Sequence, residues 1–351
     1  MAHRFIALLN ILLETLKENN IGWRTETGKI VFGHAYADDC WLITENHEDL
    51  QTLTDIVSQF CNAIQLGINS KKSYYTTTDE TATDIMITLP DGSQSPAAKR
   101  KHTDSIRYLG INISLDLNWK NHIAIMDEHI RAVCNKINSA PISYVQSQIA
   151  INLILGGFAN FHFQFVDIPR TDIKAWDNRI LNCLNKKLGL PQGTSHLQHT
   201  LPCLAGKHYY RTLESMWDAI QIGETFIRLN DTKTLMARLT KQRLLALCED
   251  RGTTTCCLKT PSPSKRHRRY NHMVAVENSL AHLGMSLDTD TLVSSHTSTR
   301  TWDIPLSKVI PPHIFSYIST EIKKHSVFYV GDLADPSGTE LLKPQQLFQR
   351  H

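Results

Sequence analysis

HAYADDCWLIT, the stretch from His34 to Thr44, places two adjacent carboxylates between two segments with strand character. The residues before the two carboxylates alternate between large and small side chains, and an apolar run follows the carboxylates directly. This pattern predicts a β-hairpin with arms near residues 30–36 and 41–44. Asp38 and Asp39 are then expected at its tight turn.

Two like charges at such a turn raise an electrostatic question. If both carboxylates are desolvated side by side, they repel each other, and one takes up a proton unless a cation neutralises the pair. Oxygen ligands of this kind suit Mg²⁺, which keeps waters and phosphates in its coordination shell. The sequence therefore predicts a divalent metal ion held by Asp38 and Asp39.

Composition indicates a folded chain with a sizeable core. The 351 residues are 41% hydrophobic and 20% charged, and the net charge is only +3. Affinity for nucleic acid must then come from local basic patches. One patch is 99–101, and another is the acid-free basic run 251–269. The second contains the cluster Lys265, Arg266, Arg268 and Arg269, which predicts nucleic-acid binding and a nuclear localisation signal, with a solvated loop as the alternative.

The eight cysteines show no CxxC pair, which is typical of reduced, intracellular proteins. Cys256 and Cys257 are followed by His267 and His272, but adjacent cysteines do not easily serve one tetrahedral ion, so no zinc site is expected there. The apolar stretches 5–16 and 149–161 are too short or too interrupted to span a bilayer, so no membrane partner is expected.

Periodicity predicts an α+β fold in which a mixed part precedes a helical one. Asn46 is the expected N-cap of a helix that ends at Gly67, and residues 90–101 are a basic segment that contains Pro, Ser and Gly. Helices are otherwise predicted at 5–16, 119–142, 145–159, 172–188 and 209–229, and strands at 73–77, 85–89 and 107–113. The predicted divisions are 1–115, an all-helical 116–250, a basic linker 251–270 and a small mixed unit 271–351.

Three motifs in order resemble the C-terminal half of the palm of a non-LTR (LINE-type) retrotransposon reverse transcriptase. The first is the YADD sequence of residues 36–39. The second is a glycine followed by a strand start, matched by Gly67, Ile68, Asn69, Lys72 and Ser73. The third is the primer-grip hairpin, matched by Tyr108, Leu109 and Gly110. The helices that follow resemble the thumb of that family, and residues 329–347 resemble a segment found late in its polyproteins.

This resemblance implies a set of site residues. Asp38 and Asp39 would bind the catalytic Mg²⁺, with Mn²⁺ as an alternative ion, and Asp38 would be the direct ligand. Lys72 would lie near the leaving pyrophosphate, whereas the plain alternative is a surface lysine. Tyr36, Tyr108, Leu109 and Gly110 would lie near the nucleic acid, although Tyr36 could equally be a core aromatic residue. The implied partners are an RNA template, a DNA primer and deoxynucleotide triphosphates.

The chain also departs from the family, whose palm has a further metal-binding aspartate and fingers upstream of the YADD hairpin. We find neither in these residues, so we expect a fragment of an RNA-directed DNA polymerase that is inactive on its own. Two other interpretations stay open: a non-catalytic RNA- or DNA-binding module, and an unrelated α/β enzyme whose carboxylate turn serves another phosphoryl reaction, such as a cyclase-like palm.

Overall fold

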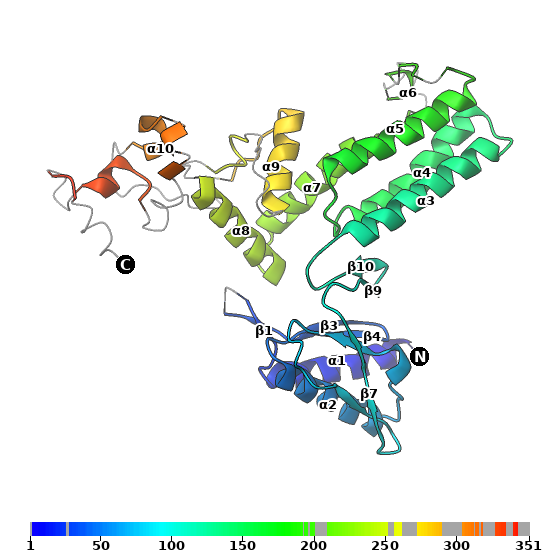
Figure 1. Cartoon of the computed structure of the whole chain (residues 1–351), viewed down its shortest axis with the longest axis vertical. Helices are drawn as coiled ribbons and strands as arrows, with labels where there is room; N and C mark the ends of the chain where they lie inside the picture. Colours follow the sequence, from blue (N-terminus) through cyan, green and yellow to red (C-terminus); the bar gives the residue numbers. More distant parts are fainter. Residues whose placement is uncertain are drawn as a thin grey trace. The chain divides into compact units, whose positions relative to one another are not determined.

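The computed structural model divides the chain into two compact units, Met1–Met126 and Asp127–His351, each described here by itself (Figure 1). The structure describes residues 2–25, 28–191, 193–195, 197–200, 209–251, 256–261, 272–289, 304–311, 313–315, 317–318, 327–334 and 340–342. The predicted α+β class is confirmed, since short strand pairs with flanking helices precede a helical region.

Two helices support the first unit. These are α1 (Ala2–Glu18) and α2 (His47–Ala63), which lie on the same side of the hairpin formed by β3 and β4 (Figure 1). Leucines at helical spacing give α1 one apolar face, so Leu12 and Leu16 are buried against Leu53 of α2. Phe32 and Leu42, at the base of the hairpin, pack on the same cluster and attach it to the helices.

The ends of α2 show one confirmed and one wrong expectation. Asn46 is the N-cap, and its side-chain oxygen accepts the Asp49 backbone N–H at 2.8 Å. The helix ends at Ala63, with Ile64 as its C-cap, and not at Gly67, because Gln65 already adopts φ of 57° and turns the chain away.

Strand pairing in the first unit is more extensive than expected. The basic segment 90–101, for which no strand was predicted, forms two strands, β7 and β8, and Ala97 between them is buried with Tyr75, Ile85 and Ile87. The strands are β1 (Trp23–Arg24), β2 (Ile30–Val31), β3 (Gly33–Tyr36), β4 (Asp39–Leu42), β5 (Tyr74–Thr76), β6 (Met86–Thr88), β7 (Gln94–Pro96), β8 (Ala98–Arg100), β9 (Ile106–Tyr108) and β10 (Ile111–Ile113). The β5–β8 pair is parallel, and the pairs β1–β2, β3–β4, β6–β7 and β9–β10 are antiparallel.

The single strand predicted at 107–113 is instead the hairpin of β9 and β10. Tyr108 pairs with Ile111, so Leu109 and Gly110 form a two-residue turn. Both turn residues have positive φ, 47° and 89°, as a type I′ turn requires. Glycine adopts positive φ without strain, so Gly110 favours this turn. Because apolar residues flank the turn on both sides, hydrophobic periodicity did not indicate where the strand is interrupted.

The second unit is mainly helical. Four of its long helices match the four predicted ones to within four residues at each end. The structure adds α8, whose weak amphipathicity left it unpredicted. The helices are α3 (Lys120–Ser139, which begins in the first unit), α4 (Tyr144–His162), α5 (Arg170–Lys187), α6 (Leu197–Thr200), α7 (Leu213–Asn230), α8 (Leu235–Arg251) and α9 (His272–Leu283). Ser143 starts α4 with a capping box shared with Gln146.

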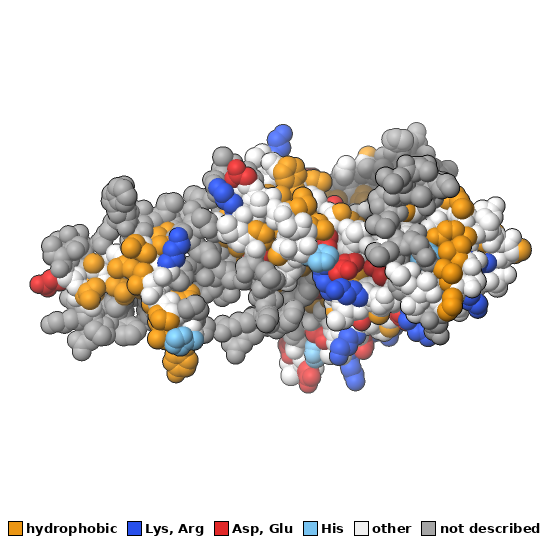
Figure 2. Space-filling model, turned by 90° about the horizontal axis from the view of Figure 1, so that it is seen from above, with side chains coloured by type: hydrophobic (Ala, Val, Ile, Leu, Met, Phe, Trp, Pro, Cys, Tyr) orange, Lys and Arg blue, Asp and Glu red, His pale blue; other side chains and the backbone are white. Residues whose placement is uncertain are grey.

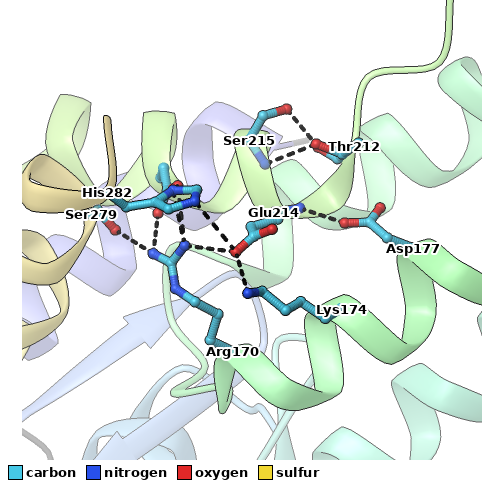
Figure 3. A network of polar contacts seen from close by, with 9 residues as sticks. Arg170, Lys174, Asp177, Thr212, Glu214, Ser215, Ser279 and His282 are labelled. Atoms are coloured by element: carbon cyan, nitrogen blue, oxygen red, sulfur yellow. Dashed lines mark hydrogen bonds and ion pairs between the residues drawn. The ribbon is translucent and has the colours of Figure 1, made fainter. Parts of the chain in front are cut away.

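A charged network joins α5, α7 and α9 (Figure 3). Arg170 of α5 donates to Glu214 at 2.8 Å and also binds Asp218, both on α7, and it reaches Ser279 of α9 at 3.3 Å. Asp218 is fully buried, and His282 contacts it at 2.8 Å from α9. A buried carboxylate needs such partners, so this network specifies how the three helices meet.

Part of the predicted linker at 251–270 lies in a core. Cys256, Cys257 and Leu258 are buried together with Leu244 of α8 and Val276 of α9. The many basic and polar residues around this apolar triplet explain why the segment reads as a linker. The predicted division of the chain at 115 and 250 stays a prediction.

The C-terminal residues that the structure describes form short pieces. These include α10 (Leu306–Val309), the 3-10 turn η2 (Val330–Leu333) and two isolated antiparallel bridges.

On the face drawn in Figure 2, hydrophobic side chains form patches between charged ones. Within the described residues, we find no helix with the length and hydropathy that a membrane span requires.

Candidate active site

The β3–β4 hairpin presents the two aspartates at its tip. Tyr36 pairs with Asp39 and His34 pairs with Trp41, so the two-residue turn consists of Ala37 and Asp38. Asp38 therefore occupies the turn, whereas Asp39 is the first residue of the return strand and not a turn residue as expected. Cross-strand partners share a face, so Tyr36, Asp39, His34 and Trp41 project to one side of the hairpin.

Two backbone features hold this geometry. Ala37 has φ of 52°, a left-handed conformation that non-glycine residues rarely adopt and that clusters at functional sites. Gly33 lies so close to the opposite strand that a Cβ placed there would lie 2.0 Å from the Trp41 carbonyl oxygen. Position 33 therefore requires glycine for the strands to pair.

Asp38 and Asp39 are both exposed to solvent. The expectation that they would be desolvated is wrong, because the hairpin tip projects beyond the helices that cover its base. Water screens their repulsion, so their charges alone do not demand a metal ion. The carboxylates remain accessible oxygen ligands of the type Mg²⁺ binds.

The second hairpin meets the first through Tyr108. Its ring contacts Trp41 edge to face with centroids 4.7 Å apart, and its hydroxyl lies 3.3 Å from Nδ1 of His34. Partial burial, and to a lesser extent the nearby Cys40 and Asp39, raise the pKa of the Tyr108 hydroxyl. The structure thus brings one predicted primer-grip residue directly to the face that carries Asp39.

Leu109 and Gly110 form the turn beyond Tyr108, and Leu109 is exposed. Tyr36 is also exposed, at 62%, so its alternative interpretation as a core aromatic residue is wrong. Exposed aromatic rings beside paired carboxylates can contact the bases or sugars of a bound strand.

Lys72 has a different environment. It ends the 3-10 turn η1 (Ser70–Lys72), which Asn69 caps by accepting the Lys72 backbone N–H. Its side chain is exposed, and within the described residues it makes no hydrogen bond or ion pair with the β3–β4 hairpin. The following strand does reach the second hairpin, since the Tyr74 hydroxyl donates to the Arg107 carbonyl at 3.3 Å.

The remaining predicted nucleic-acid contacts, Lys265, Arg266, Arg268 and Arg269, lie outside the described residues. The prediction for them stays a prediction.

Sequence reasoning missed Gly33, His34 and Trp41 as parts of the site. The sequence could have indicated His34 and Trp41. A two-residue turn at Ala37 and Asp38 places these two residues opposite each other, on the face that carries Asp39. Nothing local indicated that Tyr108, 74 residues beyond His34, would close this face.

The comparison with known families agrees with this geometry. Residues 3–113 match the family model described as reverse transcriptase (RNA-dependent DNA polymerase). The match contains both hairpins and ends at the last residue of β10. This segment is therefore similar to reverse transcriptases, a family that generally uses divalent metal ions, nucleic-acid strands and nucleotides. No curated protein matches the chain significantly.

Proposed function

We propose that this polypeptide carries the C-terminal palm and thumb of a non-LTR retrotransposon reverse transcriptase. The observation that supports the proposal most is the exposed Asp38–Asp39 tip beside the Tyr108 hairpin, within a segment that matches the reverse transcriptase family. The helices that follow would be the thumb, and the protein would work at nuclear DNA.

Asp38 and Asp39 fit the ligand preference of Mg²⁺, and Mn²⁺ would accept the same oxygens. When bound, such ions activate the primer hydroxyl and stabilise the charge on the leaving phosphates. The chain's own residues position the strands. Trp41 and Tyr108 hold the two hairpins together, while the exposed Tyr36 is available to contact the primer end. Lys72 would neutralise charge on the departing pyrophosphate once a nucleotide is bound.

We further propose that these residues alone do not extend a primer. In the part of the chain that the structure describes, no third His, Cys, Asp or Glu ligand atom is grouped with Asp38 and Asp39. Two exposed carboxylates bind a divalent ion weakly, and a two-metal reaction needs both ions held firmly. RNA template, DNA primer and nucleotide would therefore bind without rapid chemistry.

Metal binding tests the site separately from activity. We expect the full chain to bind Mn²⁺ in a titration followed by electron paramagnetic resonance, and Asp38→Asn with Asp39→Asn to lose that binding. Asp91→Asn is the matched control, because Asp91 is an exposed carboxylate in the turn between β6 and β7. Unchanged Mn²⁺ binding in the double variant would remove the proposed metal role.

Primer extension tests the predicted inactivity. On an RNA template with Mg²⁺ or Mn²⁺, we expect no extension above background by the full chain. Extension that disappears in Asp38→Ala would overturn the inactivity proposal and support the polymerase assignment.

The binding-module alternative is favoured by the same exposed, incomplete carboxylate pair. It predicts duplex affinity that falls steeply with salt and weakens in Arg266→Ala with Arg268→Ala, yet does not change in Asp38→Ala or with Mn²⁺. An affinity for primer–template that rises with Mn²⁺ only when Asp38 and Asp39 are intact would instead support the polymerase assignment.

A further inference from the structure

Three cysteines from two segments of the second unit meet in one place. Cys248 lies near the end of α8, and Cys256 and Cys257 lie in the segment that follows it. Their sulfur atoms all lie within 4.8 Å of one another, and the three residues are 8%, 3% and 3% exposed. The sequence did not indicate this grouping, because Cys248 reaches the two adjacent cysteines from the preceding helix.

The spacing of these sulfurs suits a bound metal ion. A Zn–S bond is about 2.3 Å long, so two thiolates on one tetrahedral zinc ion lie about 3.8 Å apart. The Sγ atoms of Cys248 and Cys257 are 3.7 Å apart. That distance is well beyond an S–S bond of about 2 Å, so the pair is not a disulfide.

A backbone donor points at the cluster even though the surroundings are apolar. The Cys257 backbone N–H donates to Sγ of Cys248 at 3.5 Å. Donors of this kind surround thiolate ligands in metal sites, whereas thiols buried merely as small hydrophobic groups do not require them.

We propose that Cys248, Cys256 and Cys257 bind one Zn²⁺ ion that fastens the segment after α8 to the core formed by α7, α8 and α9. Each Zn–S bond replaces an S–H bond, so three protons are released when the ion binds. Thiolates select soft ions such as Zn²⁺ over Mg²⁺, so this site is chemically distinct from the Asp38–Asp39 tip and independent of the proposed function. Within the described residues, no fourth His, Cys, Asp or Glu belongs to the group.

The metal content of the purified full chain tests this proposal. After equilibration with Zn²⁺ and removal of free ion, we expect about one zinc per chain and about none in Cys248→Ser, Cys256→Ser or Cys257→Ser. Cys134→Ser is the matched control, because Cys134 is equally buried, contacts another cysteine and lies outside the group. Zinc that is absent from the wild type, or retained in all three variants, would overturn the site.

A second measurement uses the unaltered chain, in case a variant does not fold. The reduced protein is treated briefly with an alkylating reagent, with Zn²⁺ or with a chelator, and the labelled peptides are mapped by mass spectrometry. We expect zinc to reduce labelling of Cys248, Cys256 and Cys257 at least several-fold and to leave the exposed Cys40 unchanged. Equal labelling under both conditions, or a Cys248–Cys257 disulfide in place of the metal, would overturn the proposal.

Discussion

At the scale of single residues, Gly33 has the strictest requirement in the first unit. The Cβ of any other residue would collide with the Trp41 carbonyl, and that atom belongs to the strand that carries Asp39. The residue type at position 33 is therefore constrained by the pairing of β3 with β4 and not by chemistry at position 33 itself.

We expect Gly33→Ala to destabilise the first unit by about 2–3 kcal/mol, because the strands must separate or the backbone must shift. Gly67→Ala is the matched control, since a Cβ at Gly67 meets nothing within 4 Å and its backbone is not left-handed. Urea unfolding of both variants measures the difference. Equal stability of the two would show that the hairpin tolerates a side chain at 33.

His272 is a buried titratable residue of the second unit. Burial, followed by the nearby Arg228 and Arg243, lowers its pKa to about 4 from the usual value near 6.5. Its Nε2 lies 3.2 Å from the Thr225 hydroxyl, which a neutral ring accommodates.

The pKa of His272 makes stability depend on pH in a defined direction. Between about pH 6.5 and pH 4, the unfolded chain binds a proton that the folded chain does not, so stability falls as pH falls, by up to about 3 kcal/mol. The free energy of unfolding of wild type and His272→Asn, measured across this pH range, tests this dependence. The contributions of other titratable groups cancel when one free energy is subtracted from the other. A constant difference between the two proteins would contradict the shifted pKa.

At the scale of elements, the β3–β4 and β9–β10 hairpins of the first unit act as a pair. Neither is stable alone, because isolated two-stranded hairpins are marginal in water. Leu42 anchors β3–β4 to the helices, and Tyr108 then attaches β9–β10 to the exposed face of that hairpin. The position of the predicted primer grip thus depends on this aromatic contact together with the hydrogen bond from Tyr74 to Arg107.

A double-mutant cycle on Trp41 and Tyr108 tests this dependence. We expect Tyr108→Ala to cost about 2 kcal/mol, with a coupling energy to Trp41→Ala of about 0.5–1.5 kcal/mol. Tyr108→Phe keeps the ring and loses only the His34 contact, so it should cost under about 1 kcal/mol. Additive effects of the two alanine variants would show that the hairpins are held by other contacts.

At the scale of the whole molecule, the two units have different sources of stability. The first has small apolar clusters under short strand pairs. The second relies on long helices with a buried ionic network at Arg170 and a larger core that includes the cysteine group. Loss of one key residue should therefore affect one unit and leave the other intact.

We expect Arg170→Ala to destabilise the second unit by about 3–5 kcal/mol, because Asp218 would be left buried without its main partner. Hydrogen exchange should rise in α5, α7 and α9 and stay unchanged in α1 and α2. Lys174→Ala is the control, since its 3.5 Å pair with Glu214 is largely exposed. Faster exchange throughout the chain would show that the two units unfold together.

Local chemistry in the sequence was sufficient for the α+β class, the main helices, the Asn46 cap and the carboxylate hairpin. Helical and strand periods, caps and turn residues act over a few positions, so they can be recognised without coordinates. The strands at Gln94–Pro96 and Ala98–Arg100 escaped recognition because they bury no apolar side chain of their own. Only Ala97, between them, is buried, and it is buried by contacts with distant segments.

Tertiary structure alone decided which residues meet. It exposed the Asp38–Asp39 pair that sequence reasoning had expected to be desolvated, joined Tyr108 to His34 and Trp41, and gathered Cys248 with Cys256 and Cys257. These outcomes depend on packing between segments far apart in the chain or on different elements. No short-range pattern encodes such contacts, because they form only when apolar faces from several elements share one core.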